Sequence, residues 1–272
     1  MRTSMKIRRG LRGAVDPITA QYDAILATEP DIPLLFRLIE YRGQIVLFQD
    51  APCTIPVEDI GDPVGGQRHP VTGEVLAVQT TDGARPIWGG EGVGLVFDGE
   101  SSHLLSVDDA GFLPETADFY VVADPEFNNF IDQSQILSQN ESSVTGRMQA
   151  LRIRTSPFRF SMFWSEVDTT PLEISFPSNP EEGDWYMSLS REMNEGSTGY
   201  TMRTDLFDEH GQSVGNGLIS EDEDHVILQT NSGIGFRTNG DDRYFDGNIK
   251  ALIFGEDPDS RFDIVQILSG NS

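Results

Sequence analysis

The chain has 272 residues, of which 38% are hydrophobic, and its formal net charge at pH 7 is −25. This length suits one large all-β domain or such a domain with a small appendage. No stretch approaches the roughly 18 apolar residues that cross a bilayer, which argues against membrane insertion. The acidity argues against nucleic-acid binding by the body of the protein, because phosphate contacts need a basic surface.

The charge is unevenly placed. Residues 1–13 hold five basic side chains and no acid, so the formal net charge of residues 14–272 is −30. Such an arm is a disordered tail, a docking peptide for an acidic partner, or chance. It lacks the apolar run of a secretory signal, which favours a protein kept or assembled inside a cell. The candidate docking residues are Arg2, Lys6, Arg8, Arg9 and Arg12.

Cys53 is the only cysteine in the chain. No intrachain disulfide can therefore form, which excludes the small disulfide-stapled scaffolds of secreted proteins. We expect Cys53 to be a small buried or half-buried thiol.

The N-terminal part predicts one helix and one hairpin. Asp16 followed by Pro17 is typical of a helix start, and apolar residues then recur at helical spacing, which predicts a short helix over about 17–27. The apolar runs 34–41 and 45–48, separated by a turn candidate at 42–44, predict a β-hairpin.

The rest of the chain predicts strands. From about residue 50 to residue 85 the sequence is rich in Pro, Gly, Asp and Thr, which indicates loops around short strands. Twelve short strand candidates with turn signals between them then predict a two-sheet sandwich. We divide the chain into an attachment segment (1–50), a loop-rich connection (51–79) and the sandwich (80–272). The strand candidates are 94–97, 119–123, 135–138, 148–154, 158–164, 172–175, 184–190, 199–206, 225–229, 234–238, 247–254 and 262–268.

Three motifs in the sandwich region resemble the concanavalin A-like, laminin-G-type jelly rolls. Arg85-Pro86 with Gly94–Gly99 resembles the opening strand of that family, Gly183–Leu189 its tryptophan-bearing strand, and Tyr244–Phe254 with Ile264–Leu268 its closing strand and tail. The resemblance implies an all-β, antiparallel jelly-roll sandwich. The chain departs from the pattern at 203–211, where the acidic turn is longer.

Near the N-terminus, Gly10–Gly13 and Asp16–Thr19 resemble the start of tailed-bacteriophage structural proteins. This resemblance implies a non-enzymatic virion component (head decoration, spike, tail or fibre) that is assembled in the host cytoplasm and anchored to capsid or tail proteins by its N-terminal segment. By analogy with such components, we expect a homo-oligomer.

No catalytic constellation is recognisable in the sequence. The acidic run Glu221-Asp222-Glu223-Asp224 lacks the apolar alternation that places glycosidase acids on one strand face, and it is typical of a solvated loop. The four histidines are scattered, and no hydrolase or phosphate-binding motif occurs. We therefore expect a protein that is not an enzyme. Glycosidase activity carried by Glu221 and Glu223 stays open as an alternative.

Sugar binding is the other alternative, as a module that recognises host surface glycans. Loops at the rim of a jelly roll can present aromatic faces and polar groups to a sugar, whereas Trp164 and Trp185 lie within strands and are expected in the core. The candidate sugar-binding residues are Trp88, Tyr200, Asn239, Asp241 and Arg243. We expect no cofactor, with a Ca²⁺ site as the alternative, for which the candidate ligands are Asp98, Asp241, Asp242 and Asp246.

Overall fold

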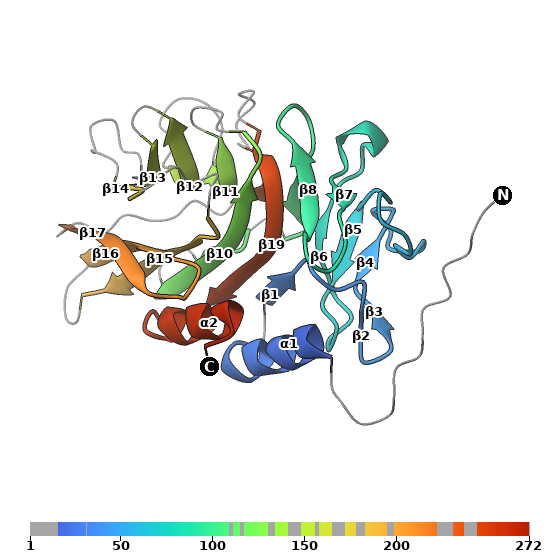
Figure 1. Ribbon diagram of the computed structural model, residues 1–272, viewed down its shortest axis with the longest axis horizontal. Helices are drawn as coiled ribbons and strands as arrows, with labels where there is room; N and C mark the ends of the chain where they lie inside the picture. The colour runs from blue at the N-terminus through green and yellow to red at the C-terminus, as the bar shows by residue number, and fades with distance from the viewer. Residues whose placement is uncertain are drawn as a thin grey trace.

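The computed structural model describes a sandwich of two antiparallel sheets with one helix near each end of the chain (Figure 1). Every strand pair among the described residues is antiparallel, which confirms the predicted all-β, two-sheet fold class. The structure describes residues 16–30, 32–108, 111–114, 117–129, 134–140, 148–155, 158–164, 172–177, 183–194, 199–221, 231–236 and 244–271.

The first sheet has eight strands, and β19 (Asp246–Gly255) lies at its centre. One edge of β19 pairs with β10 over its whole length, and the other edge pairs first with β8 and then with β1. The remaining order follows β10 outward through β15, β16 and β17, and β8 outward to β7. The bounds are β1 (Ile32–Leu35), β7 (Ile87–Trp88), β8 (Leu95–Asp98), β10 (Phe119–Phe127), β15 (Tyr186–Met193), β16 (Tyr200–Phe207) and β17 (Ser213–Glu221).

The second sheet has nine strands in the order β14-β13-β12-β11-β18-β9-β6-β5-β4. A separate hairpin of β2 (Glu40–Tyr41) and β3 (Gln44–Ile45) precedes it. The bounds are β4 (Leu47–Phe48), β5 (Gly66–Arg68), β6 (Val75–Val78), β9 (Leu104–Ser106), β11 (Gln135–Asn140), β12 (Met148–Thr155), β13 (Phe158–Trp164), β14 (Leu172–Ser175) and β18 (Ser232–Ile234).

The two α-helices lie together at one end of the sandwich (Figure 1). α1 (Pro17–Thr28) begins as predicted, because the Asp16 carboxylate accepts a hydrogen bond from the Thr19 N–H at 3.0 Å. The Gln21 side chain then donates to the carbonyls of Ile267 and Leu268 in α2 (Ser260–Ser269), at 2.9 and 3.0 Å. A single 3₁₀ turn, η1, covers Asp82–Ala84. No helix among the described residues is long and apolar enough to cross a membrane.

α2 corrects the strand predicted at 262–268. A short apolar run does not distinguish a strand from a helix. The spacing of the buried residues and the glycine that ends the segment identify it as a helix. Ile264, Val265 and Leu268 recur at helical spacing and are buried, while Gly270 ends the helix in the left-handed conformation at φ 74°. The left-handed conformation at that position favours glycine.

The predicted hairpin forms at the predicted turn, but it is shorter than the apolar runs at 34–41 and 45–48, whose outer parts join other strands. β1 pairs with β19, β4 pairs with β5, and only the turn around Arg42 and Gly43 closes a hairpin, between β2 and β3. The predicted loop-rich connection supplies β5 and β6 to the second sheet. Strands β1, β4 and β6 are thus built into the two sheets, because their apolar side chains complete the same core.

Cys53 is 3% exposed and free, as expected. Burial raises the pKa of its thiol, and the neighbouring Arg68 opposes that shift in part. Its Sγ lies against Gly66, where a side chain would have no room. The thiol therefore fills space under β5 and has the character of a packing residue.

Candidate functional site

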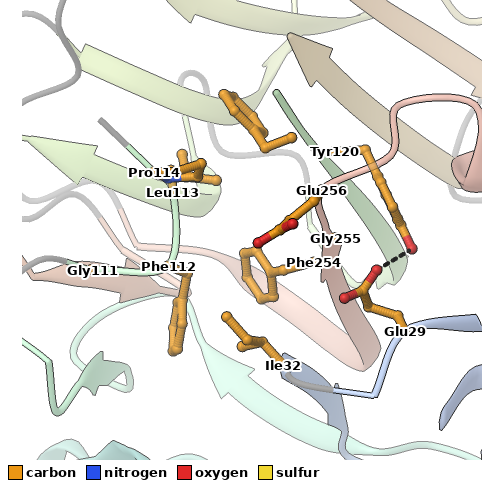
Figure 2. Close-up of a pocket in the computed structure, with 11 residues that line it drawn as sticks. Glu29, Ile32, Gly111, Phe112, Leu113, Pro114, Tyr120, Phe254, Gly255 and Glu256 are labelled. Carbon is orange, nitrogen blue, oxygen red and sulfur yellow. Dashed lines mark hydrogen bonds between the residues drawn. The ribbon is translucent and has the colours of Figure 1, made fainter. Parts of the chain in front are cut away.

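A cavity of about 230 Å³ opens where β1 begins and β19 ends (Figure 2). The two strands are antiparallel neighbours, with Ile32 opposite Phe254, so the residues just before β1 and just after β19 reach the same end of the sheet. The lining residues are Glu29, Ile32, Gly111, Phe112, Leu113, Pro114, Phe119, Tyr120, Phe254, Gly255 and Glu256.

The opposite wall of the cavity is the loop 111–114, which is tied to the second sheet. The Phe112 N–H donates to Ser232 Oγ at 2.9 Å, and the Gln139 amide exchanges two hydrogen bonds with the Leu113 backbone at 3.0 and 3.1 Å. Gln139 is 2% exposed. Buried polar contacts of this kind hold a loop in one position. One wall of the cavity therefore belongs to the first sheet, and the other is fixed to the second sheet.

Aromatic rings make up much of the cavity wall. The rings of Phe112 and Phe254 lie 4.8 Å apart between centroids and are tilted by 32°. Phe112 is the more exposed of the two, at 9% against 2%. Figure 2 shows the Phe254 ring between the side chains of Phe112 and Glu256. The two rings therefore form an apolar part of the lining, and Phe112 contributes more of the exposed ring surface.

Two carboxylates stand at the cavity. Glu29 ends α1, and Tyr120 Oη lies 3.5 Å from its Oε2. Burial raises the pKa of Tyr120 far above its ordinary value, and the Glu29 charge adds to the effect, so the hydroxyl keeps its proton at all ordinary pH values. Glu256 follows β19 and is exposed. Gly255 between them has no room for a side chain, because a Cβ would overlap Glu29 and the Tyr120 ring.

A second hollow of about 690 Å³ adjoins the first and shares Ile32, Gly111 and Phe112 with it. Its other lining residues come from the two ends of β6 and the segment after β9: Thr72, Glu74, Val75, Leu76, Val107 and Asp108. We call the two hollows together the groove.

A third cavity of about 500 Å³ lies beside the groove and shares Thr72 with it. His69 in its wall has a fixed role. Its Nδ1 accepts from the N–H groups of Val71 and Thr72 at 3.2 and 3.1 Å, so Nε2 carries the proton and lies 3.0 Å from the Pro30 carbonyl. His69 is 1% exposed, so it anchors the 69–74 turn to the start of β1.

Two of the predicted sugar-binding residues lie away from the groove. Trp88 is 6% exposed on β7 and Tyr200 is 1% exposed on β16. Neither lines the groove. Asn239, Asp241 and Arg243 lie outside the described residues, as do the docking candidates Arg2, Lys6, Arg8, Arg9 and Arg12.

Two of the predicted calcium ligands are neighbours across the β8–β19 pair, where Asp98 lies opposite Asp246. Burial alone would raise the pKa of Asp98, but hydrogen bonds from the N–H groups of Ser101, Ser102 and Glu100 hold it well below its ordinary value. Asp98 thus closes its own turn. Asp241 and Asp242 lie outside the described residues, and the part of the chain that is described contains no group of three or more potential metal ligands. Calcium binding stays a prediction.

Acids alternating with apolar residues on one strand do occur, on β10. Asp124 and Glu126 flank Pro125 there, which sequence inspection had missed. Asp124 is 1% exposed and ion-paired with Arg37. Lys250 Nζ lies 3.6 Å from Glu126 and 3.2 Å from Asp184. We call these groups the β10 ion cluster; it borders none of the three cavities described above.

Sequence inspection also missed the groove residues. Their local signals were weak, because Glu29 and Glu256 each follow the end of an element, as many surface acids do, and Phe112 stands alone in a short loop. The acidic run singled out from the sequence is only partly described: Glu221 ends β17, and 222–224 lie outside the described residues.

No protein-family profile matches the sequence, and no curated protein matches it. Solved structures do match the fold. A Trypanosoma rangeli sialidase superposes with a TM-score of 0.54 at 12% identity over 93% of this chain and 39% of its own. An arabinofuranosidase bound to arabinofuranosyl-α-1,2-xylobiose gives 0.51 at 10% identity over 77% and 51%. The chain thus spans about half or less of these proteins.

A third match is the enzymatically active domain of tailspike protein 2 of bacteriophage CBA120, with a TM-score of 0.44 at 11% identity over 86% of this chain and 36% of its own. That score is too low to support an argument. The first two matches correct the expectation that the chain is not an enzyme. The same sandwich occurs in glycoside hydrolases, so the lack of a recognisable catalytic motif in the sequence does not exclude catalysis.

Proposed function

We propose that the chain binds carbohydrate and that the groove holds the sugar. The observation that carries the proposal is the meeting of aromatic rings and carboxylates in one hollow: Phe112 from the 111–114 loop, Phe254 on β19, and Glu29 and Glu256 among the other lining residues. The fold supports it, because the sialidase and the arabinofuranosidase that share the sandwich are carbohydrate-active proteins by name.

The two kinds of wall match the two kinds of sugar surface. A sugar ring has an apolar C–H face, which packs on aromatic rings, and an edge of hydroxyls, which donate to carboxylates in charge-assisted hydrogen bonds. Few polar groups in a largely apolar hollow are typical of small-ligand sites, in which they orient the ligand.

Removal of the Phe112 ring tests this proposal. Phe112→Leu keeps an apolar side chain of similar burial, and we expect about a fivefold loss of affinity for any saccharide that binds, since aromatic contacts contribute on the order of 1 kcal/mol. A glycan array followed by titration calorimetry on the best hit measures it. The matched control is Phe262→Leu on α2, which removes a ring that packs on Phe207 away from the groove. Equal affinity in both variants contradicts the proposal.

A second candidate function is hydrolysis of the bound glycan. Glycosidases work with two carboxyl groups on either side of the scissile bond, and Glu29 and Glu256 both line the first cavity (Figure 2). Hydrolysis predicts release of reducing ends from the saccharide found on the array. Glu29→Gln and Glu256→Gln should each lower that rate at least about a hundredfold. Binding without any release of reducing ends leaves the chain as a binding protein.

The finer proposal places the sandwich in a tailed-phage virion, as a concanavalin A-like or laminin-G-type domain. Residues 1–13 then dock on an acidic surface of a capsid or tail protein. The strong contrast between this arm and a body of charge −30 supports it. Deletion of residues 1–13 should abolish incorporation into particles, as measured by mass spectrometry of purified virions, while circular dichroism stays unchanged. Incorporation at the full level contradicts it.

A further inference from the structure

Strand β17 differs from the other outer strands of the two sheets. β7 is covered on its outer side by a bridge between Ile87 and Pro63, and β4 by a bridge between Phe48 and Pro56. β1 and β14 have only four residues each, and β14 carries the charged Glu173. β17 has nine residues, and no described residue forms a backbone hydrogen bond with its outer side (Figure 1).

The outer side of β17 also lacks the usual protection of a sheet edge. A free row of backbone N–H and C=O groups pairs readily with another strand, so proteins place charged side chains or proline on long edges. From Ser213 to Ser220, β17 contains neither, although the chain has 44 acidic residues. The edge is therefore able to accept a further strand.

The regular part of β17 is residues 215–221. These residues pair with β16 without interruption, whereas the ladder shifts at Val214. Two identical antiparallel strands that pair edge to edge are related by a two-fold axis, so one residue of the strand lies opposite itself. The register centred on Leu218 pairs the whole regular part, with Gly215 opposite Glu221 and Gly217 opposite Ile219.

The side chain at this centre suits a contact between two copies. Leu218 is 59% exposed, while Gly217 and Ile219 on either side of it are half-buried, so Leu218 stands on the outer face of the sheet. Side chains directly opposite each other on paired strands are in contact, so two Leu218 side chains would cover each other's apolar surface. Elsewhere the acidic body opposes association, because like charges repel.

From these features we infer that two copies of the chain join edge to edge through β17 and extend the first sheet across a two-fold axis at Leu218. The occupant of the edge is a second copy because the strand is complementary to itself: it offers backbone groups to backbone groups and leucine to leucine, with no charge from 215 to 220. This gives the expected homo-oligomer a specific surface. The inference does not depend on carbohydrate binding.

Sedimentation velocity of the full chain over a concentration series tests the inference. We expect a dimer with a dissociation constant on the order of 10 μM, because one pair of strand edges is smaller than a standard interface. The constant should fall at least about threefold between about 50 and about 500 mM salt, since ions screen the repulsion between two acidic bodies. A chain that stays monomeric up to about 500 μM overturns the inference.

Two substitutions of Leu218 test the surface and the register together. Leu218→Lys and Leu218→Glu each place like charges opposite each other at the axis, so each variant alone should dimerise at least about tenfold more weakly than the parent. An equimolar mixture of the two should regain the dimer, because an ammonium then faces a carboxylate. The matched controls are Ile87→Lys and Ile87→Glu on β7, the outer strand at the other end of the same sheet, where Ile87 is 46% exposed. They should dimerise like the parent.

Circular dichroism checks that the variants fold like the parent, which is expected because the substituted side chains are exposed. A dimer that Leu218→Lys leaves intact overturns the assignment to β17. Loss of the dimer in both Leu218 variants without recovery in their mixture overturns the axis at Leu218. A dimer weakened to the same extent by the Ile87 variants also overturns the inference, because charge at any exposed edge then has the same effect.

Discussion

The carboxylates of the groove and those of the β10 ion cluster differ in what surrounds them. On β10, Asp124 is buried against Arg37, and Glu126 lies near Lys250. In the groove, Glu29 and Glu256 line a cavity with no basic residue among its described lining residues. Acids with a cation beside them stabilise a fold by holding segments together, whereas the exposed carboxylate of Glu256 lines a cavity that a ligand can enter. The surroundings of an acid thus distinguish the acids that stabilise the fold from those that can contact a ligand.

The largest effect on the unfolding free energy is expected for a substitution of Asp124, and it tests whether the β10 acids are structural. Asp124→Ala leaves Arg37 without its carboxylate next to a buried strand, and removal of one partner of a buried pair costs about 3–5 kcal/mol of unfolding free energy. Urea denaturation followed by fluorescence measures it. The double variant Arg37→Leu/Asp124→Leu should lose less than Asp124→Ala. A loss under about 1 kcal/mol in the single variant would mean that the pair does not hold the turn after β1 against β10.

An intermediate effect is expected at Asp98, an acid used by its own turn. Asp98→Asn should cost about 1 kcal/mol at pH 7, a modest value because the side chain is exposed and solvent screens it. The folded pKa is lowered, so the stabilisation is fully present above the unfolded value of about 4 and is lost as the pH falls through the folded value. The gap between variant and parent in urea titrations should therefore close below about pH 4. A gap that widens on acidification would contradict this sign.

The smallest effect on stability is expected at Glu256. Glu256→Gln changes an exposed side chain, and such changes usually alter the unfolding free energy by less than about 0.5 kcal/mol. Thermal denaturation of the parent and the variant at pH 7 measures this difference in stability. A large loss would place Glu256 with the structural acids of the β10 ion cluster and remove the distinction between the two groups.

Much of the sandwich was predictable from the strand pattern. The strands expected at 158–164 and 172–175 have those bounds in β13 and β14, because apolar side chains at every second position require a half-buried strand. β17 was missed. Its Gly-Asn-Gly centre has low strand propensity, and its pairing with β16 provides the ladder that the local sequence does not favour. The helix α2 was mistaken for a strand because its apolar run is short.

The sequence by itself determined that this protein is a two-sheet β-sandwich, with a helix starting at Pro17 and a strongly acidic body. Hydrophobic periodicity and capping are local properties, so they can be read without the fold. Only the tertiary structure decided where the groove lies. Residues 29, 74, 108, 112 and 256 meet in one groove because β1 and β19 pair at opposite ends of the chain and Gln139 holds the 111–114 loop against them. Long-range pairing of this kind produces no local sequence pattern, so the residues that it brings together cannot be identified from the sequence.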